Sequence, residues 1–502
     1  MIKGPVLVID AGSSRLRCHI FDGEGTIVAS SATEWAYLEE PDAPSMARSF
    51  DPQQLWDGIC LAIRQCAADA PTSLGVVSCI AVTSQRQGVV FLDAAGNEIY
   101  AGPNMDLRAV FEGAAIDEEF REHVYGVTGH LPSFFFTPAK LRWFQQQRPK
   151  AYGRIATVLT LADWLAWRLT GVVANEVTLA GEAGLLDIGS RQWCNGLLRE
   201  LELPERTGPL VKSGVVAGNV SGHAASATGL AVGVPVTIAG ADTQCGLLGM
   251  GVAETGHVGV VAGWSAPVQM VTAQPKLSPE MRTWAGCHVL DDGWVAESSA
   301  GDTGNAYQWL ADTVYGDRSD PFADMAIDAS FSGSGANGAV AFMGNGAMDM
   351  GSVGMTYGGL MFPVPLNAAT GKIQRKDLAR AALESTAYAI RANIEQLEAV
   401  TGQSAMSISL GGGMTRTAAF PKILVDVLGR DVLLSSLPDA TAIGTFLCAK
   451  TVLGDFRDLR EAAAHARSDM RLLQPDARNA AQYEEYYKGW IRLSESLRNI
   501  EL

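Results

Sequence analysis

The chain has 502 residues, of which 47% are apolar and 18% charged, and it contains 54 glycines. This length and composition predict a soluble globular protein of about two to four domains with many tight turns. Lys and Arg number 38 against 54 Asp and Glu, a net charge of −16, which argues against nucleic acid or an anionic membrane as the main partner. A nucleotide substrate stays compatible with this charge, because backbone N–H groups and Mg²⁺ can hold phosphates.

Targeting and metal-binding motifs are missing from the sequence. The first apolar stretch is too short for a signal peptide and is interrupted by Asp10, and no run of 18 apolar residues predicts a membrane span. The eight cysteines form no CxxC pair and the seven histidines no HxxxH pair, so we expect neither zinc nor haem. We therefore expect a cytoplasmic protein.

The first predicted strand, Val6–Ile9, is followed by a loop of small and polar residues. Asp10 stands at the end of the strand, where it can hold Mg²⁺ through water. Gly12 allows a ligand to approach the backbone closely, and the hydroxyls of Ser13 and Ser14 can bind a phosphate. A strand followed by Asp-x-Gly is also common as an ordinary turn, so this motif alone leaves both interpretations open.

A second polar group follows the predicted buried strand Cys79–Thr83. Polar side chains at strand ends can bind a polyhydroxy ligand, and an aromatic ring can form one wall of its pocket. The candidates here are Gln85, Arg86, Gln87, Asp106 and Phe135. The alternative is a set of solvated loops with the phenylalanine in the core.

The middle of the chain places one carboxylate in a segment of small residues. Val236–Ala239 reads as a short buried strand that leads to Asp242, and open α/β sheets place chemistry at such strand ends. Asp242 could equally be a turn residue between a strand and a helix. Cys245 could be a nucleophile, although a buried apolar thiol is the commoner case.

The second half repeats the pattern of the first. His257–Val271 reads as strand, small-residue turn and strand, as Val6–Ala29 does. This similarity predicts two α/β domains of related architecture that face a shared cleft. We place their boundary between residues 247 and 248, giving domains of residues 1–247 and 248–502.

Two later glycine-rich segments suit a nucleotide. Ala300–Leu310 begins a helix from a glycine-rich loop, where free N–H groups can bind phosphate, although Asp302 there could simply be an N-cap. A predicted strand, Ser407–Leu410, is followed by Gly411–Thr417 and then a helix, which can form a flat platform for an adenine ring. The chain contains no GxxxxGK[ST], GxGxxG or GxSxG motif, which argues against P-loop enzymes, dinucleotide dehydrogenases and serine hydrolases.

Taken in order, these stretches resemble the FGGY carbohydrate kinases, a branch of the actin-like, ribonuclease-H-like ATPase superfamily. The matching pieces span nearly the whole chain and include VLVIDAGSSRLRCHIFD, AVTSQRQGVVFLD, PNMDLRA, ADWLAWRLTG, IAGADTQCGLLGMG, SSAGDTGNAYQWL, SLGGGMTRTAAFPKILVDVLG and DATAIGTFLCA. The resemblance implies two actin-like (ribonuclease-H-like) domains closing on a central cleft, with the sugar mainly on the first domain and ATP mainly on the second.

The resemblance also implies a role for each candidate residue. Asp242 would be the general base that takes the proton from the accepting hydroxyl, and Asp10 would organise Mg²⁺. The sugar side would comprise Gln85, Arg86, Gln87, Asp106 and Phe135. The ATP side would comprise Gly12, Ser13, Ser14, Arg17, Gly263, Ser265, Gly304, Gln308, Gly411, Gly412, Gly413 and Thr417. This division agrees with the needs of phosphoryl transfer, which are positioning, charge neutralisation and one base.

The sequence departs from the family pattern at three positions near these loops, and one of them is Arg15, which stands where a small residue is usual. Gly263 is followed by Trp264 rather than threonine, so a hydroxyl contact is either missing or supplied by Ser265. Met105 replaces the tryptophan common before the sugar-binding aspartate. Some segments look most like the autoinducer-2 kinase group, others like glycerol and polyol kinases or xylulokinases, so the substrate is left open among a pentulose, a polyol and an autoinducer-2-type compound.

The alternatives from other classes are an actin-like ATPase that binds protein and a catalytically inactive sugar-binding regulator. An actin-like ATPase that binds protein would not need the polar side chains at Gln85–Gln87. An inactive regulator is expected to lack the base, whereas Asp242 is present. As partners we expect a small sugar or polyol, neither nucleic acid nor a membrane, and we leave open a homodimer.

Overall fold

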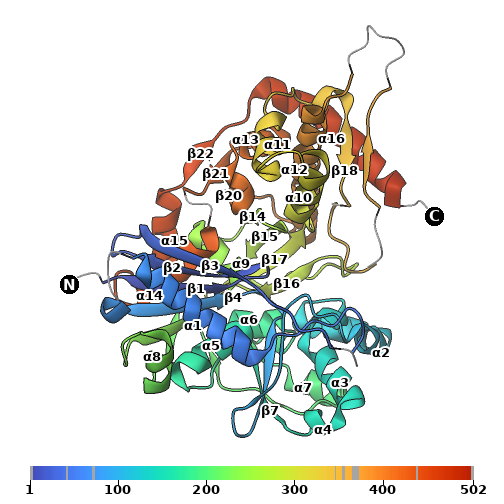
Figure 1. Ribbon diagram of the computed structural model, residues 1–502. Coiled ribbons are helices and arrows are strands. Elements are labelled where there is room, and N and C mark those ends of the chain that lie inside the picture. Colours follow the sequence, from blue (N-terminus) through green and yellow to red (C-terminus); the bar gives the residue numbers. More distant parts are fainter. Residues whose placement is uncertain are drawn as a thin grey trace.

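Two mixed sheets form the centre of the fold, and each draws its strands from one half of the chain. The structure is a computed structural model that describes residues 4–40, 43–70, 74–344, 346–352, 357–364, 372–436 and 439–498. The first sheet has the order β12 (Val215–Asn219), β13 (Pro235–Ala241), β4 (Cys79–Ser84), β1 (Val6–Ala11), β2 (Arg15–Phe21) and β3 (Ile27–Glu34). Figure 1 shows this half of the chain, in blue to green, below the other half.

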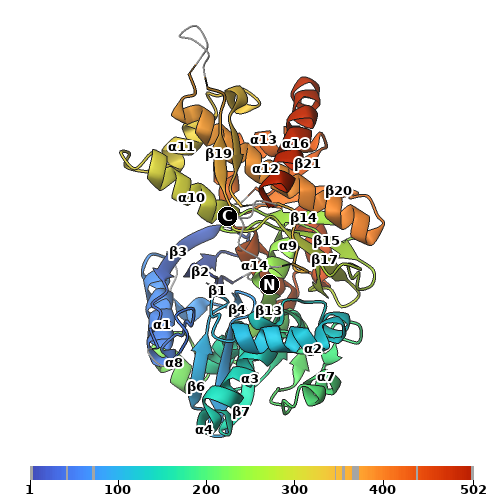
Figure 2. The ribbon, with the colours of Figure 1, turned by 90° about the vertical axis from the view of Figure 1, so that its right-hand side faces the viewer.

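The second sheet is built from residues 284–473 together with the hairpin that precedes them. Its order is β16 (Trp284–Cys287), β17 (Trp294–Ser299), β15 (Pro267–Thr272), β14 (His257–Val261), β20 (Ser407–Gly411), β21 (Val432–Leu434) and β22 (Arg471–Leu473). The view in Figure 2, turned by a quarter, shows the same separation into a lower, blue-to-cyan part and an upper, yellow-to-orange part.

The two sheets share one topology. In the first, β1 runs antiparallel to β2 and parallel to β4. In the second, β14 runs antiparallel to β15 and parallel to β20. The predicted α/β fold with two related domains is confirmed. The predicted boundary after residue 247 falls within helix α9 (Asp242–Gly249) and stays a prediction.

Helices and small sheets surround these two centres. The first half contributes α1 (Pro52–Ala68), α2 (Val110–Thr128), α3 (Thr137–Gln147), α4 (Pro149–Tyr152), α5 (Leu161–Thr170), α6 (Val177–Glu182), α7 (Asn195–Glu200) and α8 (Gly222–Thr228). The second contributes α10 (Thr303–Val314), α11 (Pro321–Ala329), α12 (Arg375–Thr401), α13 (Ala419–Leu428), α14 (Ala440–Val452), α15 (Leu459–Ser468) and α16 (Ala477–Arg498). The small sheets are β5 (Val89–Asp93) with β6 (Glu98–Gly102) and β7 (Ile155–Thr160), β8 (Asn175–Glu176) with β11 (Leu210–Val211), β9 (Leu186–Asp187) with β10 (Gln192–Trp193), and β18 (Val340–Phe342) with β19 (Gly359–Met361).

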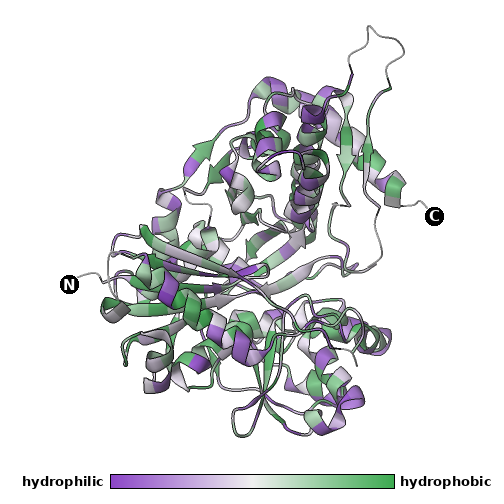
Figure 3. Ribbon diagram, viewed as in Figure 1, coloured by the Kyte–Doolittle hydropathy of each residue, from purple (hydrophilic) through white to green (hydrophobic). Residues whose placement is uncertain are grey.

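The central strands β1 and β4 are buried along their whole length and mostly apolar, because both faces of the first sheet are covered. All six residues of β1 are buried, and Figure 3 shows central strands in the green of apolar residues while many outer helices carry purple, hydrophilic positions. One face of the first sheet is covered by a helix from the far end of the chain. Val6 and Val8 share a core cluster with Leu447 of α14, and Phe21 stacks on Phe446 at 4.6 Å.

Helices α9 and α14 hold equivalent places, since α9 follows β13 and α14 follows β21. They pack against each other at glycines. A Cβ atom added to Gly249 would lie 2.1 Å from the carbonyl oxygen of Ala440, and one added to Gly444 would lie 1.8 Å from that of Cys245. The two helices therefore touch backbone to backbone between the two sheets.

Among the residues that the structure describes, none of the helices combines the length and the apolar character needed to cross a bilayer.

Candidate active site

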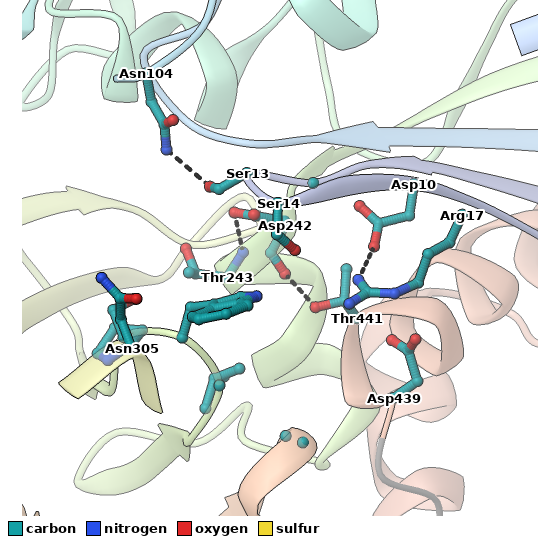
Figure 4. Close-up of a pocket in the computed structure, with 18 of the residues that line it drawn as sticks. Asp10, Ser13, Ser14, Arg17, Asn104, Asp242, Thr243, Asn305, Asp439 and Thr441 are labelled. Atoms are coloured by element: carbon teal, nitrogen blue, oxygen red, sulfur yellow. Dashed lines mark hydrogen bonds and ion pairs between the residues drawn. The ribbon is translucent and has the colours of Figure 1, made fainter. Parts of the chain in front are cut away.

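A cavity of about 610 Å³ opens between the two sheets. Both halves of the chain line it, and Figure 4 shows Asp242 between Asp10 on one side and Asn305 on the other. Its lining comprises Asp10, Gly12, Ser13, Ser14, Arg17, Glu34, Trp35, Tyr37, Asn104, Met105, Asp242, Thr243, Val261, Gly263, Trp264, Ser265, Pro267, Asp302, Asn305, Gly412, Gly413, Arg416, Asp439, Ala440 and Thr441.

A bulge at the end of β13 positions Asp242. The pairing of β13 with β4 shifts register between Ile238 and Gly240, and Gly240 adopts φ +131°, which favours glycine. Thr83 Oγ1 donates to the carbonyl of Gly240 at 2.7 Å, so a hydroxyl on the neighbouring strand fixes the bulge. Asp242 then begins α9, where its Oδ1 accepts the N–H of Thr243 at 2.8 Å.

The environment of Asp242 favours its protonated form. Burial raises its pKa to about 6, against the attraction of Arg86 and the N–H of Thr243, and the charges of Glu182 and Glu297 add to the rise. A carboxylate with such a pKa is suited to accept a proton near neutral pH. Cys245, the alternative nucleophile, is buried, and burial raises its pKa to about 12, so it is a structural thiol.

Asp10 ends β1 with one oxygen paired and one free. Arg17 donates from Nη1 to Oδ2 at 3.3 Å, as Figure 4 shows. In the described part of the chain, no group hydrogen-bonds to the buried Oδ1. Burial raises the pKa of Asp10 to about 7 against the attraction of Arg17, and the charges of Asp439 and Asp242 raise it further. The charge of Arg17 therefore does not offset the burial of this carboxyl.

Asp439, just before α14, brings a third carboxylate to the cavity. Its Oδ1 accepts the N–H of Ala442 at 3.1 Å, and His19 Nε2 lies 3.5 Å from Oδ2. Burial opposes ionisation, but the contact with His19 and the charge of Arg17 outweigh it and lower the pKa of Asp439. The sequence motif DATAIG contained this residue, but Asp439 was not predicted as part of the site.

The loop after β1 is held open toward the cavity by side chains around it. Trp35 donates from its indole N–H to the carbonyl of Gly12 at 2.7 Å, and Asn104 donates to Ser13 Oγ at 2.8 Å. Gln85 is buried beneath them, donating to the same Gly12 carbonyl at 3.3 Å and accepting the N–H of Asn104 at 2.9 Å. Gln85 thus supports the loop rather than lining the cavity.

The loops of the second half meet the cavity from the opposite side. Gly412 has φ +100°, and a Cβ there would lie 2.4 Å from the carbonyl oxygen of Ala262, so glycine is required. The carbonyl of Trp264 accepts the N–H groups of Gly304 at 2.9 Å and Asn305 at 3.2 Å. The start of α10, which the sequence suggested as a phosphate site, is therefore already capped by the loop that contains Trp264.

Ten of the predicted ligand-binding and catalytic residues line the cavity together. They are Asp10, Gly12, Ser13, Ser14, Arg17, Asp242, Gly263, Ser265, Gly412 and Gly413. The others lie outside this lining: Gln85, Arg86, Gln87, Asp106, Phe135, Gly304, Gln308, Gly411 and Thr417. Gln308 donates to Asp312 at 2.9 Å and Thr417 to the carbonyl of Met414 at 3.3 Å, whereas Gly411 ends β20.

The predicted sugar-binding residues are divided between two polar networks. Asp106 is fully buried, where Tyr100 Oη and Arg108 Nε donate to one oxygen and the N–H of Arg48 to the other. Its carboxylate therefore links Arg48, Tyr100 and Arg108 by hydrogen bonds and does not face the cavity. Arg86 instead pairs with two glutamates close to Asp242.

Two further predicted residues lie near Arg86. Gln87 adopts φ +60°, and its carbonyl accepts a hydrogen bond from the Lys140 ammonium at 3.1 Å. The ring of Phe135 meets that of Trp284 edge-on at 6.4 Å, and Arg86 lies over the same indole, 5.5 Å from its centre. These contacts place Arg86, Gln87 and Phe135 in one neighbourhood.

Two sheets of equal topology face one cavity with carboxylates and glycine loops on its walls, an arrangement suited to a two-domain phosphotransferase. The comparisons with known proteins narrow this class. Residues 5–249 match the N-terminal domain of the FGGY family of carbohydrate kinases, and residues 258–451 match its C-terminal domain. The chain belongs to the FGGY family of carbohydrate kinases.

Individual relatives agree with this assignment. The autoinducer-2 kinase of Klebsiella pneumoniae is 30% identical over 97% of this chain and 92% of its own length. A xylulose kinase structure from Brucella ovis superposes with a TM-score of 0.85 at 22% identity, covering 99% of both chains. The ADP-bound glycerol kinase of Plasmodium falciparum superposes with a TM-score of 0.83 at 18% identity, again over 99% of both chains.

Proposed function

We propose that this protein transfers the γ-phosphoryl group of ATP to a hydroxyl of a small sugar or polyol, with Asp242 as the general base. The observation that carries the proposal is the place of Asp242 in the cavity. A carboxylate whose pKa is raised to about 6 faces the same space as the serine loop of β1 and the glycine loop after β20. That combination supplies a proton acceptor next to groups that can hold phosphates.

The chain's own groups divide the work of the reaction. Asp242 accepts the proton of the attacking hydroxyl, and its hydrogen bond from Thr243 fixes the carboxylate. Ser13 and Ser14 present hydroxyls and backbone N–H groups to the transferred phosphoryl group, and Arg17 adds a positive charge beside them. Gly263, Ser265, Gly412 and Gly413 form the facing wall. Closure of the two domains excludes water, so that the phosphoryl group reaches the sugar rather than being hydrolysed.

The residues around Asp10 fit a magnesium ion that accompanies ATP. No three His, Cys, Asp or Glu residues of the described chain are arranged to hold a metal by themselves. Mg²⁺ is commonly bound by one or two carboxylates together with water and substrate phosphates. The free, buried Oδ1 of Asp10 is suited to accept a hydrogen bond from a water of such an ion. When bound, Mg²⁺ would neutralise charge on the phosphates.

We assign the nucleoside of ATP to a space beside the main cavity. A second cavity, of about 400 Å³, is lined by Asp302, Asn305, Ala306, Trp309, Met343 and Gly358. Asp302 and Asn305 line both cavities, so a ligand can extend from one into the other. Gly304 and Gln308 belong to the helix that begins there, and Gly411 and Thr417 flank the glycine loop opposite. We assign these four residues to the support of the nucleotide site.

On the acceptor side we assign Arg86, Gln87 and Phe135 to the sugar pocket and give Gln85 and Asp106 supporting roles. This division follows burial and bonding, because Gln85 holds the loop at Gly12 while Asp106 is enclosed by Tyr100 and Arg108. The relatives' names suggest an autoinducer-2-type compound, a pentulose or a polyol as substrate. Location in the cytoplasm and formation of a homodimer stay predictions.

The test is release of ADP from Mg·ATP against a panel of polyols, ketopentoses, ketohexoses and the autoinducer-2 precursor. One strong acceptor is the expected result. A protein that hydrolyses ATP equally well without any acceptor would be an ATPase of the same fold instead. Binding of an acceptor without ADP release, at saturating Mg·ATP, would identify a sugar-binding regulator.

A further inference from the structure

Arg86 is held by two buried glutamates. It follows β4, and its guanidinium donates to both oxygens of Glu297, at 2.5 and 2.9 Å, and to Glu182 at 3.2 Å. The side chains of Glu182 and Glu297 are each 2% exposed and that of Arg86 is 13% exposed. Bidentate arginine–carboxylate contacts of this kind are among the strongest hydrogen-bonded ion pairs in proteins.

This cluster spans the two domains. Arg86 and Glu182 belong to the first half, where Glu182 ends α6, whereas Glu297 lies on β17 of the second sheet. Gln269 on the neighbouring strand β15 donates to Glu297 at 2.7 Å. The pair of Arg86 with Glu297 is therefore formed across the junction between the halves and requires their close approach.

Hydrogen bonds connect the cluster to the cavity. Thr243, which lines the cavity, donates from Oγ1 to the side-chain oxygen of Gln244 at 2.7 Å. Gln244 in turn donates to Glu182 at 2.8 Å. Asp242 is close enough for Arg86, Glu182 and Glu297 all to affect its pKa. The cluster is thus the charged environment of the proposed base.

The charges of the cluster do not favour an anion. One arginine faces two glutamates, and Asp242 adds a third carboxylate nearby. His130, whose Nε2 lies 3.5 Å from Glu182, would bring the arginine and two glutamates only to neutrality if it were protonated. The buried Lys140 next to this region donates to the carbonyl of Gln87 and is not directed at the cluster.

We infer that the acceptor site selects uncharged polyhydroxy compounds and rejects sugar acids. Arg86 could bind the carboxylate of a sugar acid, but it is already paired with Glu182 and Glu297. Glu297 is then a specificity-determining residue supplied by the second domain. This inference rests on the proposed function, since it concerns the acceptor of the same site. Arg86 is already paired with two glutamates, so an anionic ligand would add its charge to a cluster that is negative in sum, and we expect the preference to exceed about tenfold in affinity.

The test compares neutral and acidic ligands of equal chain length, such as ribitol with ribonate and glucitol with gluconate, together with the acceptor found in the ADP assay and its aldonate. Affinities are measured by calorimetry in the presence of Mg²⁺ and a non-hydrolysable ATP analogue, for the wild type and for Glu297→Gln. We expect the wild type to favour the neutral member and Glu297→Gln to reduce that preference about tenfold. Glu297→Asp, which keeps the charge, should retain it.

Glu384→Gln is the matched control. Glu384 pairs with Arg380 at 2.8 Å, with side chains 3% and 12% exposed, so the change removes an equally buried pair within the second half. It should lower stability without altering the preference for neutral ligands. If Glu297→Gln does not fold, Glu182→Gln tests the same charge from the first domain.

The outcomes separate this inference from the proposed function. Binding with the expected preference but no ADP release would overturn the kinase and leave the charge selection standing. ADP release with neutral and acidic acceptors alike, or an unchanged preference in folded Glu297→Gln, would overturn the charge selection and leave the kinase. Failure of every pair to bind would overturn the assignment of an acceptor site beside Arg86.

Discussion

Asp242 and Asp439 occupy equivalent positions in the two halves of the fold, and their pKa values shift in opposite directions. Asp242 stands at the start of α9, which follows β13, and Asp439 at the start of α14, which follows β21, and both line the cavity. Burial raises the pKa of Asp242 to about 6, while at Asp439 the contact with His19 and the charge of Arg17 outweigh burial and lower the pKa. The same position therefore holds a carboxyl suited to accept a proton in the first half and a carboxylate that stays ionised in the second.

Replacing Asp242 by Asn should abolish most activity and stabilise the fold. A positioned base contributes about 10²–10⁴ in rate, so kcat in the ADP assay should fall by that factor. The folded-state pKa of about 6 lies above the ordinary 3.8, so the fold holds this proton more tightly than the unfolded chain. The contribution of Asp242 to stability is thus lost as the pH rises through 6. At pH 7.5 the Asp242→Asn variant should therefore have a free energy of unfolding about 2 kcal/mol higher than that of the wild type.

The pH dependence of that stabilisation provides its control. At pH 4 the folded carboxyl is almost fully protonated and the unfolded one about half, so the difference in unfolding free energy between wild type and variant should fall well below 1 kcal/mol. Chemical unfolding at pH 7.5 and pH 4 measures both values. A variant that keeps its turnover would show that another group accepts the proton.

Activity of the wild type should decline in acid because Asp242 must be ionised to act as the base. The kcat/KM for the acceptor, measured between pH 5 and 9 at saturating Mg·ATP, should fall about tenfold per pH unit below a pKa of about 6. A profile that stays flat down to pH 5 would contradict the assignment of the base to Asp242.

Replacing Asp10 by Asn should weaken the dependence of nucleotide binding on magnesium. A carboxylate that holds a metal through its water contributes about 10–100-fold to metal affinity. Calorimetric titration of ADP with and without Mg²⁺ should therefore show a smaller gain from Mg²⁺ in the variant. Asp22→Asn, in the turn after β2, removes a carboxylate that bonds only to its own turn in the described structure, and it should leave the gain intact. Equal gains in wild type and Asp10→Asn would remove Asp10 from the magnesium site.

Replacing Gly412 by Ala should distort the glycine loop. Its φ of +100° and the 2.4 Å approach to the carbonyl of Ala262 leave no room for a methyl group, and we expect a loss of about 2–3 kcal/mol with weaker ADP binding. The neighbouring Gly413 is the control, because in the described structure a Cβ there meets no atom within 4 Å. Thermal unfolding and ADP titration should separate the two variants, and equal behaviour would contradict the role of Gly412.

Local patterns in the sequence predicted the elements that carry the site. The predicted strand Val236–Ala239 lies within β13, and the predicted strand Ser407–Leu410 lies within β20. Nine of the ten predicted residues that line the cavity lie at or just after the end of a strand, and the tenth, Arg17, lies on β2. They could be predicted because strand ends and glycines have local signatures that do not depend on distant parts of the chain.

The polar networks could not be predicted, because their members are far apart in the sequence. Arg86 and Glu297 are separated by 211 residues, and no local motif connects them. Asp106 was grouped with the sugar ligands, but Arg108, two residues later, folds back onto it and encloses it. The sequence marks Asp439 only as the first residue of the matching piece DATAIGTFLCA, because its contact with His19 depends on the packing of α14 against the first sheet.

The backbone contact of α9 with α14 has a consequence for the carboxylates at their starts. Gly249 and Gly444 bring the two helices together without any intervening side chain, so the helices approach as closely as their main chains allow. Side-chain packing can relax when one residue changes, whereas the main chain cannot shrink. The spacing of Asp242 and Asp439 is therefore set by the thickness of the polypeptide itself, and one methyl group at Gly444 would alter it without touching either acid.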